Sequence, residues 1–227
     1  MGCWRALLVA ACCVAPWQGG DAQVSAGRVA GRLTMLEKKG KPSPDLAAAV
    51  VYLERHAAPQ SPLATEIAIS DKEFVPRVVA VPVGSAVRFT NHDPFEHNVF
   101  SVSEPATFDL GQYGRGEAKQ WTFTAPGLVR VYCNVHPRMV AFVHVMATRY
   151  YSQPVADGTF AIEDVAPGQY ALHVWHERSP EAVRELSVAA AGVSGLEIQL
   201  DARGFRRVEH KNKFGDDYVT DAGRDRY

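Results

Sequence analysis

The stretch GLVRVYCNVHPRMVAFVHV, residues 127–145, determines the fold that we expect for the middle of the chain. Apolar side chains alternate with other residues on both sides of a short loop. Successive side chains of a β-strand point to opposite faces, so this alternation predicts two strands joined by the loop. Their phase places Cys133 and Met139 inward at one end of a sandwich, with His136 in the loop that Pro137 stiffens.

The same alternation continues upstream and predicts an all-β protein. Seven short segments between residues 65 and 145 are rich in Val, Ile, Phe and Thr, and Gly, Pro, Asn or Asp separates them. No amphipathic helix interrupts them. We therefore expect an antiparallel sandwich over residues 63–147.

The flanking segments predict a second, smaller β-sandwich. Residues 27–54 contain two candidate strands, and residues 148–200 contain about four more. Two strands cannot bury a core alone, so we expect residues 24–58 and 148–201 to form one discontinuous domain into which the middle module is inserted. Alternatively, the first two strands form an edge hairpin on the middle module. Residues 202–227 mix both charge signs and predict a solvated, partly disordered tail.

Residues 1–22 have the layout of a secretory signal peptide. Arg5 precedes an apolar run, and a small, polar stretch ends at Ala22, where we expect cleavage. The apolar run is too short to cross a bilayer, and we expect no transmembrane segment after signal removal. A lipid anchor at Cys12, in the segment VAAC, and a buried N-terminal helix are the alternatives.

Export would leave Cys133 as the only thiol, because Cys3, Cys12 and Cys13 all lie within the signal. Exported compartments are oxidising and favour disulfides, yet Cys133 would have no partner. A bound metal would protect an unpaired cysteine and give it a purpose. The competing interpretation is an inert, buried cysteine beside a surface histidine and a core methionine.

A metal site needs a ligand from outside this stretch, and the segment NHDPFEHNVF, residues 91–100, offers two histidines. His97 begins a strand and can point into the same end of the core, whereas His92 lies in the turn and should face solvent. Two imidazoles, one thiolate and one thioether form the ligand set of a blue-copper electron-transfer site. We therefore predict one type 1 copper ion per chain, held by His97, Cys133, His136 and Met139.

Three segments carry a resemblance to a known family: FVPRVVAVPVGSAVRFTN, HNV and PGLVRVYCNVHPRMVAFVHV. They resemble the cupredoxins, most closely amicyanin and plastocyanin. The resemblance covers residues 66–147 and implies a Greek-key sandwich with the same four copper ligands. It also implies that Asn98 ties the first ligand's strand to the cysteine loop and tunes the sulfur. The electron would leave through the ring edge of His136, within an apolar patch of Pro94, Phe95 and Pro137.

The flanks carry a less specific resemblance, through GRVAGRL, AAAVVYLE and ADGTFAIEDVAPGQYALHVW. These segments are similar to the prealbumin-like, carboxypeptidase-regulatory-type fold. That resemblance implies no catalytic residue.

The other histidines are interpreted as ordinary polar residues. We expect His144 to be exposed, and His173 and His176 to point to opposite faces of one strand, while His56 and His210 are isolated. No His-x-His pair, Ser-His-Asp spacing or phosphate-binding glycine loop is present in the sequence. The net charge of −1 argues against a nucleic-acid partner. These observations predict a protein that is not an enzyme.

We predict a periplasmic type 1 copper protein that carries single electrons between redox partners, such as a c-type cytochrome or a periplasmic dehydrogenase. The alternatives are a protein that binds or delivers copper without carrying electrons, and a structural or adhesion module. The strand after Met139 leads away from the metal for roughly 20 Å at about 3.3 Å per residue. The flanking module should therefore lie at the far pole and leave the copper end free.

Overall fold

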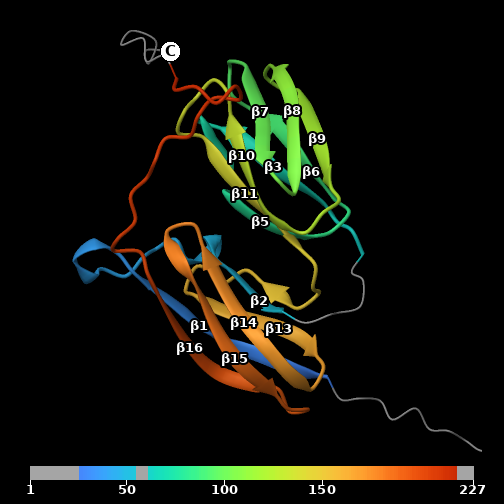
Figure 1. The fold of residues 1–227 in the computed structure, drawn as a ribbon, viewed down its shortest axis with the longest axis vertical. Helices are drawn as coiled ribbons and strands as arrows, with labels where there is room; N and C mark the ends of the chain where they lie inside the picture. The colour runs from blue at the N-terminus through green and yellow to red at the C-terminus, as the bar shows by residue number, and fades with distance from the viewer. Residues whose placement is uncertain (1–25, 55–60, 219–227) are drawn as a thin grey trace, which may run out of the picture.

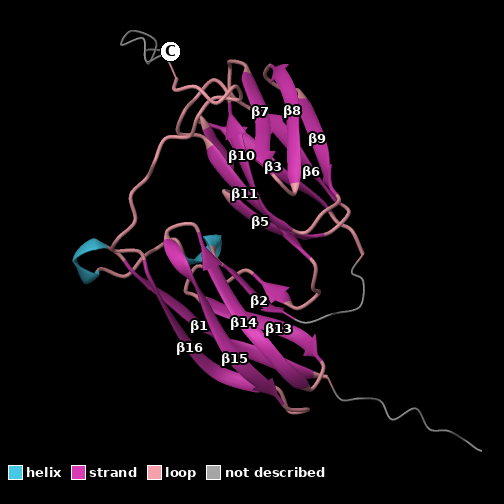
Figure 2. Cartoon of the chain, viewed as in Figure 1, coloured by secondary structure: helices cyan, strands magenta, loops and turns pink. Residues whose placement is uncertain are grey.

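The computed structural model describes residues 26–54 and 61–218, and its secondary structure consists almost entirely of strands, arranged in four sheets (Figures 1 and 2). The prediction of an all-β protein with two sandwiches is confirmed. The predicted signal peptide, the alternative anchor at Cys12 and the isolated His56 lie outside the described residues. Within the described part of the chain, no helix has the length and apolarity needed to cross a membrane.

The middle module is a sandwich of two sheets around one apolar core (Figure 1). One sheet has the order β5-β11-β10-β7-β8 and the other has the order β4-β3-β6-β9. The strands are β3 (Ala64–Ser70), β4 (Glu73–Val75), β5 (Val78–Pro82), β6 (Ser85–Asn91), β7 (His97–Ser103), β8 (Ala106–Tyr113), β9 (Ala118–Phe123), β10 (Gly127–Cys133) and β11 (Val140–Met146).

Two of these strands, β4 and β8, were absent from the seven that the sequence predicted. The strand β4 has only three residues, too few for an alternating pattern to show. The strand β8 is an edge strand that carries Phe108 and Tyr113 inward but exposes most of its other side chains. An edge strand pairs on one side only, and its weak alternation hides it in the sequence.

The flanking module draws its strands from both sides of the middle module. Its sheets have the orders β13-β1-β16 and β12-β2-β14-β15, and they enclose a separate apolar core. Among the described residues, β1 and β2 pair only with strands that follow residue 150. The elements are β1 (Gly27–Leu36), η1 (Lys38–Gly40), η2 (Leu46–Ala48), β2 (Val50–Glu54), β12 (Tyr151–Ser152), β13 (Thr159–Val165), β14 (Gly168–His176), β15 (Ser179–Val188) and β16 (Val193–Asp201).

A third apolar cluster joins the two modules. Val78 and Phe142 from the middle module are buried with Val50, and Trp175 packs against the same cluster. Beside them, the guanidinium of Arg77 forms a two-pronged salt bridge with Glu177, with N–O distances of 2.6 and 2.8 Å. The outer face of β11 is therefore covered by the flanking module.

This contact corrects the expectation that His144 is exposed. Its imidazole is only 8% exposed. The rings of Tyr52 and Trp175 lie edge-on to it, with centroids 5.3 and 5.8 Å away. The strand phase was right, because His144 does point away from the core of its own module, but the second module covers that face.

Residues 202–218, the described part of the predicted tail, are mostly exposed, but some of them make specific contacts with the middle module. After β16 the chain returns along one side of the molecule and ends against the far end of the middle module (Figure 1). On the way, residues 205–210 form one wall of a cavity of about 450 Å³ between the two modules. The ring of His210 stacks on Tyr132, and further hydrogen bonds hold residues 213 and 218. The flanking module lies at the pole opposite the 134–139 loop, as expected, but the tail occupies part of the end that was expected to be free.

Candidate metal centre

Strand pairing brings the predicted ligands to one end of the sandwich. β7 begins where its antiparallel neighbour β10 ends, with Cys133 opposite Val99. His97 is the first residue of β7, so its ring reaches the cysteine although the two residues are 36 positions apart. His136 follows in the loop between β10 and β11.

The three strongest donors converge closely. The Sγ atom of Cys133 lies 3.5 Å from Nδ1 of His97 and 3.7 Å from Nδ1 of His136. All three donor atoms lie within 4.8 Å of one another, and no other such group of His, Cys, Asp or Glu side chains occurs in residues 26–54 and 61–218. Met139 is buried in the same core as Cys133, with 2% of its surface exposed.

These spacings fit a bound metal ion. First-row metals such as zinc bind nitrogen at about 2.0 Å and sulfur at about 2.3 Å. With an angle of about 110–120° at the metal, the two donors are then roughly 3.5–3.7 Å apart. The measured S–N separations have these values, and both histidines present Nδ1 to the sulfur. The donors therefore have the arrangement that coordination requires.

The His97 ring is fixed from behind by Asp93. Nε2 of His97 lies 2.9 Å from Oδ2 of Asp93, and both groups are buried. The backbone N–H groups of Asp71 and Lys72 donate to the same carboxylate at 2.7 and 3.0 Å. A carboxylate that accepts from the outer nitrogen of a ligating histidine sets its tautomer and orientation.

The electrostatics of this pair also suit coordination. Burial lowers the pKa of His97, which keeps the ring neutral and able to bind metal. Burial alone would raise the pKa of Asp93, but the N–H donors of Lys72 and Asp71 and the His97 ring hold it below its usual value. Asp93 was not among the residues predicted from the sequence; the signal was an acidic residue four positions before His97 in the turn NHDPFEH.

Burial and hydrogen bonding have opposite effects on the Cys133 sulfur. Burial raises the pKa of the Cys133 thiol, while the backbone N–H groups of Val135, Asn98 and His136 act in the opposite direction. Val135 N lies 3.4 Å from the sulfur. A metal cation would displace the thiol proton, and the N–H groups would then stabilise the thiolate.

Asn98 connects the two ligand segments through its main chain. Its backbone carbonyl accepts a hydrogen bond from the Asn134 N–H at 2.9 Å, so main-chain atoms tie the strand to the loop. Its side-chain Nδ2 donates to Asp109 at 2.6 Å. Its Oδ1 atom has no hydrogen-bond partner among the described residues.

Of the three residues predicted for the exit patch, Phe95 lies in a cluster of rings with the two histidines, and Pro137 lines the cavity between the modules. The Phe95 ring lies 5.2 Å from that of His97 and 5.6 Å from that of His136, measured between centroids. Phe95 and His136 are half-buried, Pro94 is exposed, and Val135 beside them is 40% exposed. His92 is exposed, as predicted, and is not part of the donor group.

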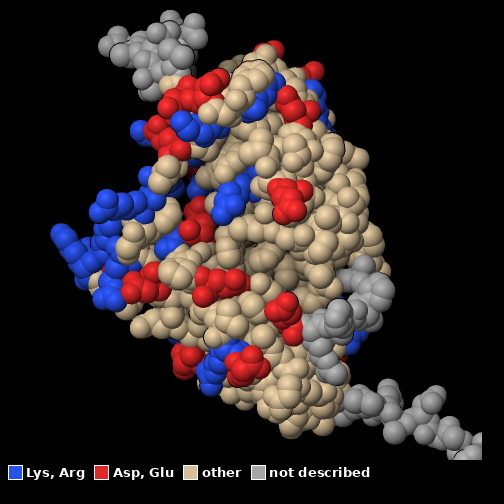
Figure 3. Space-filling model, viewed as in Figure 1, with Lys and Arg blue, Asp and Glu red and all other residues tan. Residues whose placement is uncertain are grey.

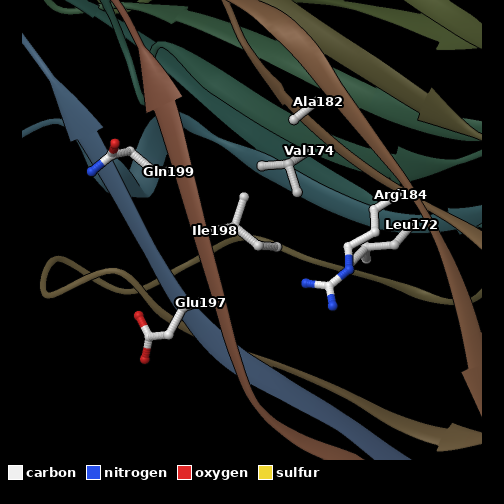
Figure 4. A pocket seen from close by; sticks show the side chains of 7 residues that line it. All are labelled: Leu172, Val174, Ala182, Arg184, Glu197, Ile198 and Gln199. Atoms are coloured by element: carbon white, nitrogen blue, oxygen red, sulfur yellow. The ribbon is translucent and has the colours of Figure 1, made fainter.

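A separate cavity of about 180 Å³ lies in the flanking module, far from these donors (Figure 4). It is smaller than the roughly 300 Å³ at which ligand pockets begin. Its lining is mostly apolar and contains Leu172, Val174, Ala182, Arg184, Glu197, Ile198 and Gln199. These residues indicate a small hollow between the two sheets of that module.

Comparison with known proteins finds a family model that matches the middle of the chain. Residues 62–146 match the model of the family described as copper binding proteins, plastocyanin/azurin family. No curated protein matches the chain. Copper is therefore the cofactor of this centre, and the three converging donors fit a single type 1 ion.

Solved structures that resemble the chain cover only part of it. A purple cupredoxin from Nitrosopumilus maritimus is 26% identical, covers 36% of this chain and 99% of its own, and has a TM-score of 0.33. A copper-containing nitrite reductase from Thermus scotoductus is 29% identical, with 42% of this chain and 25% of that chain covered and a TM-score of 0.36. A reduced amicyanin variant is 27% identical, with 37% and 82% covered and a TM-score of 0.34.

Proposed function

We propose that the protein is an exported carrier of single electrons, in which His97, Cys133, His136 and Met139 hold one copper ion. The observation that carries this proposal is the convergence of Nδ1, Sγ and Nδ1 at coordination spacing within a buried end of the sandwich. A copper ion held in this way alternates between two oxidation states and so accepts and donates one electron.

The protein's own contribution is to keep the donors still. Cys133 ends a strand that is hydrogen-bonded on both sides, and the Asp93 carboxylate holds the His97 ring. Donors fixed by packing and hydrogen bonds keep their positions when the charge at the centre changes. Small rearrangement would favour fast electron exchange, so we infer a carrier and not an enzyme.

The electron would pass through the edge of the His136 ring. This ring is half-buried beside Phe95, Pro94 and the exposed Val135, which together form a small apolar surface. Such a surface suits the small, transient contacts of redox complexes. We propose a c-type cytochrome or a dehydrogenase of the same compartment as the partner.

The proposed organisation follows the strand pairing. Residues 24–58 and 148–201 would form one prealbumin-like domain, with the copper domain at 63–147 inserted into it. Removal of residues 1–22 on export would place the protein in the periplasm, where Cys133 would be its only thiol.

Copper loading tests the proposal directly. Addition of Cu(II) to the purified protein should give an intense blue sulfur-to-copper charge-transfer band, and voltammetry should show a reversible one-electron wave. Cys133→Ser should abolish the band, whereas His92→Ala, which changes an exposed histidine of the same segment, should keep it. A band that survives Cys133→Ser would refute the ligand assignment. A colourless protein that holds only Cu(I) would support copper delivery in place of electron transfer.

A further inference from the structure

We propose that residues 210–218, which we call the C-terminal strap, are an integral part of the copper centre, and that Tyr218 and Lys213 are positioning residues for its ligand loop. This inference rests on the proposed function for its consequence in electron transfer. Its structural part, a restraint on the loop that carries Cys133 and His136, stands on contacts within the chain itself.

The strap is bonded directly to the ligand loop. The hydroxyl of Tyr218 donates to the backbone carbonyl of Cys133 at 2.7 Å. The backbone N–H of Lys213 donates to the side-chain oxygen of Asn134, the next residue, at 2.9 Å. Two consecutive residues at the metal donor are therefore held by a segment about 80 positions further along the chain.

The strap is also linked, through Asp109 of β8, to the strand that carries the other histidine. Nζ of Lys213 donates to Oδ2 of Asp109 at 2.6 Å, and Oδ1 of Asp109 accepts from the Asn98 side chain at 2.6 Å. Asn98 follows His97, and its carbonyl accepts from the Asn134 N–H. Lys213, Asp109, Asn98 and Asn134 thus form a closed ring of hydrogen bonds that spans both ligand segments.

Aromatic packing fixes the strap against the side of β10. The His210 ring stacks on the Tyr132 ring, with centroids 4.3 Å apart and planes 26° apart. Tyr218 stands edge-on to His210 at 5.3 Å. The strap also has structure of its own, since Oδ1 of Asn212 accepts from the N–H groups of residues 214 and 216.

The charges of the strap match those of the surface beneath it. Acidic and basic side chains gather together where the tail crosses the upper part of the molecule in Figure 3. Lys213 pairs with Asp109, and Arg138 of the ligand loop pairs with Glu209 just before the strap, at 3.3 Å. The mixed charge that predicted a solvated tail is thus partly used in contacts with the copper domain.

The position of the strap indicates that it restrains the ligand loop and does not cover the exit patch beside His136. It lies on the Tyr132 side of the centre and contacts the carbonyl side of Cys133. Val135 next to it stays 40% exposed, and Pro94 stays exposed. The exit patch therefore remains open to a partner while the loop is held from the side.

Two single substitutions in the full-length chain test this role. Tyr218→Phe removes only the hydroxyl that reaches Cys133, and Lys213→Met removes the bond to Asp109. Tyr151→Phe and Lys41→Met are matched controls in the flanking module, one half-buried tyrosine and one exposed lysine. Urea unfolding of each variant establishes that its global stability matches that of its control.

The first readout needs no metal. Alkylation of Cys133 by N-ethylmaleimide, followed by mass spectrometry of the peptide that contains it, reports how often the loop opens. Loss of one hydrogen bond at the loop should raise the rate about tenfold in each strap variant and leave the controls unchanged. Equal rates in strap variants and controls, at equal global stability, would overturn the proposed restraint.

The second readout uses the copper-loaded protein. The strap variants should shift the charge-transfer band and the reduction potential relative to the controls, because the sulfur donor would be held less firmly. A purely structural tail would leave both unchanged, and that result would overturn the positioning role. A protein that fails to give any blue band would refute the proposed electron carrier, while the alkylation result would still decide the restraint.

Discussion

Replacement of Asp93 by asparagine should change two properties that can be measured separately, the orientation of the His97 ring and the stability of the fold. The carboxylate accepts three hydrogen bonds, one at Oδ1 from Asp71 N and two at Oδ2 from Lys72 N and His97 Nε2. An amide has a single acceptor oxygen. In Asp93→Asn, at least one of the three donors must therefore face an NH₂ group inside a site that is 5% exposed.

Two magnitudes follow from this count. A buried donor left without an acceptor costs about 1–3 kcal/mol, so the metal-free protein should lose about that much free energy of unfolding. Loss of a carboxylate behind a ligating histidine weakens metal binding by about 10–100-fold. Urea unfolding of the metal-free protein measures the first effect, and competition with a chromogenic Cu(I) chelator at pH 7 measures the second.

Asp157→Asn is the matched control, because Asp157 also accepts a backbone N–H in a turn, from Thr159 at 2.8 Å, but lies in the flanking module. It should leave copper affinity unchanged. If Asp93→Asn lowered the stability of the metal-free protein and left Cu(I) affinity and the blue band as in the control, the bond to His97 would have no part in orienting the ligand. The role that we assign to Asp93 would then be limited to its turn.

Three further predictions concern the rest of the molecule. Phe142→Ala should lower the free energy of unfolding by about 3–5 kcal/mol, because Phe142 is only 6% exposed at the contact between the modules. Differential scanning calorimetry should then show two transitions in place of one. A single unchanged transition would contradict the role of that contact. Burial lowers the pKa of His176, which faces Asp45, Glu177 and Arg178, so its neutral form favours folding. The stability that it contributes should be complete above pH 6.5 and should fall by at most about 1.4 kcal/mol per pH unit on acidification; His176→Gln should flatten urea midpoints measured from pH 7.5 to 5. Copper that binds only the folded chain should add about 4 kcal/mol at a free concentration 1,000 times its Kd, and removal by a chelator should return the thermal midpoint to that of the metal-free protein.

Cys133 and His97 could be placed from the sequence because they lie on strands with a strict period of two. The phase of Val129, Val131 and Cys133 fixes which face each side chain occupies, and all three are fully buried. In β7, the alternation places His97 on the same inward face as Val99. Such local geometry requires no knowledge of distant contacts.

The surroundings of Asp93 and His144 escaped prediction because they depend on packing between distant segments. The Asp93 carboxylate is held where it meets the His97 ring because the turn at residues 71 and 72 supplies two N–H groups to it. His144 has a polar side chain on an outward face, and only the insertion of one module into another buries it. Neither effect leaves a periodic signal in the sequence.

The C-terminal strap shows the same principle most clearly. A polar segment with few apolar residues cannot offset the entropy of its own ordering, so composition alone predicts disorder. A prediction from composition assumes that a segment must supply its own apolar core. Here the folded surface of the middle module already provides partners for the strap: the Tyr132 ring, the Asn134 amide and the Asp109 carboxylate. The order of the strap is therefore encoded less in residues 210–218 than in the copper domain. A substitution on that surface, such as Asp109→Asn, should release the strap as effectively as a change within the strap itself.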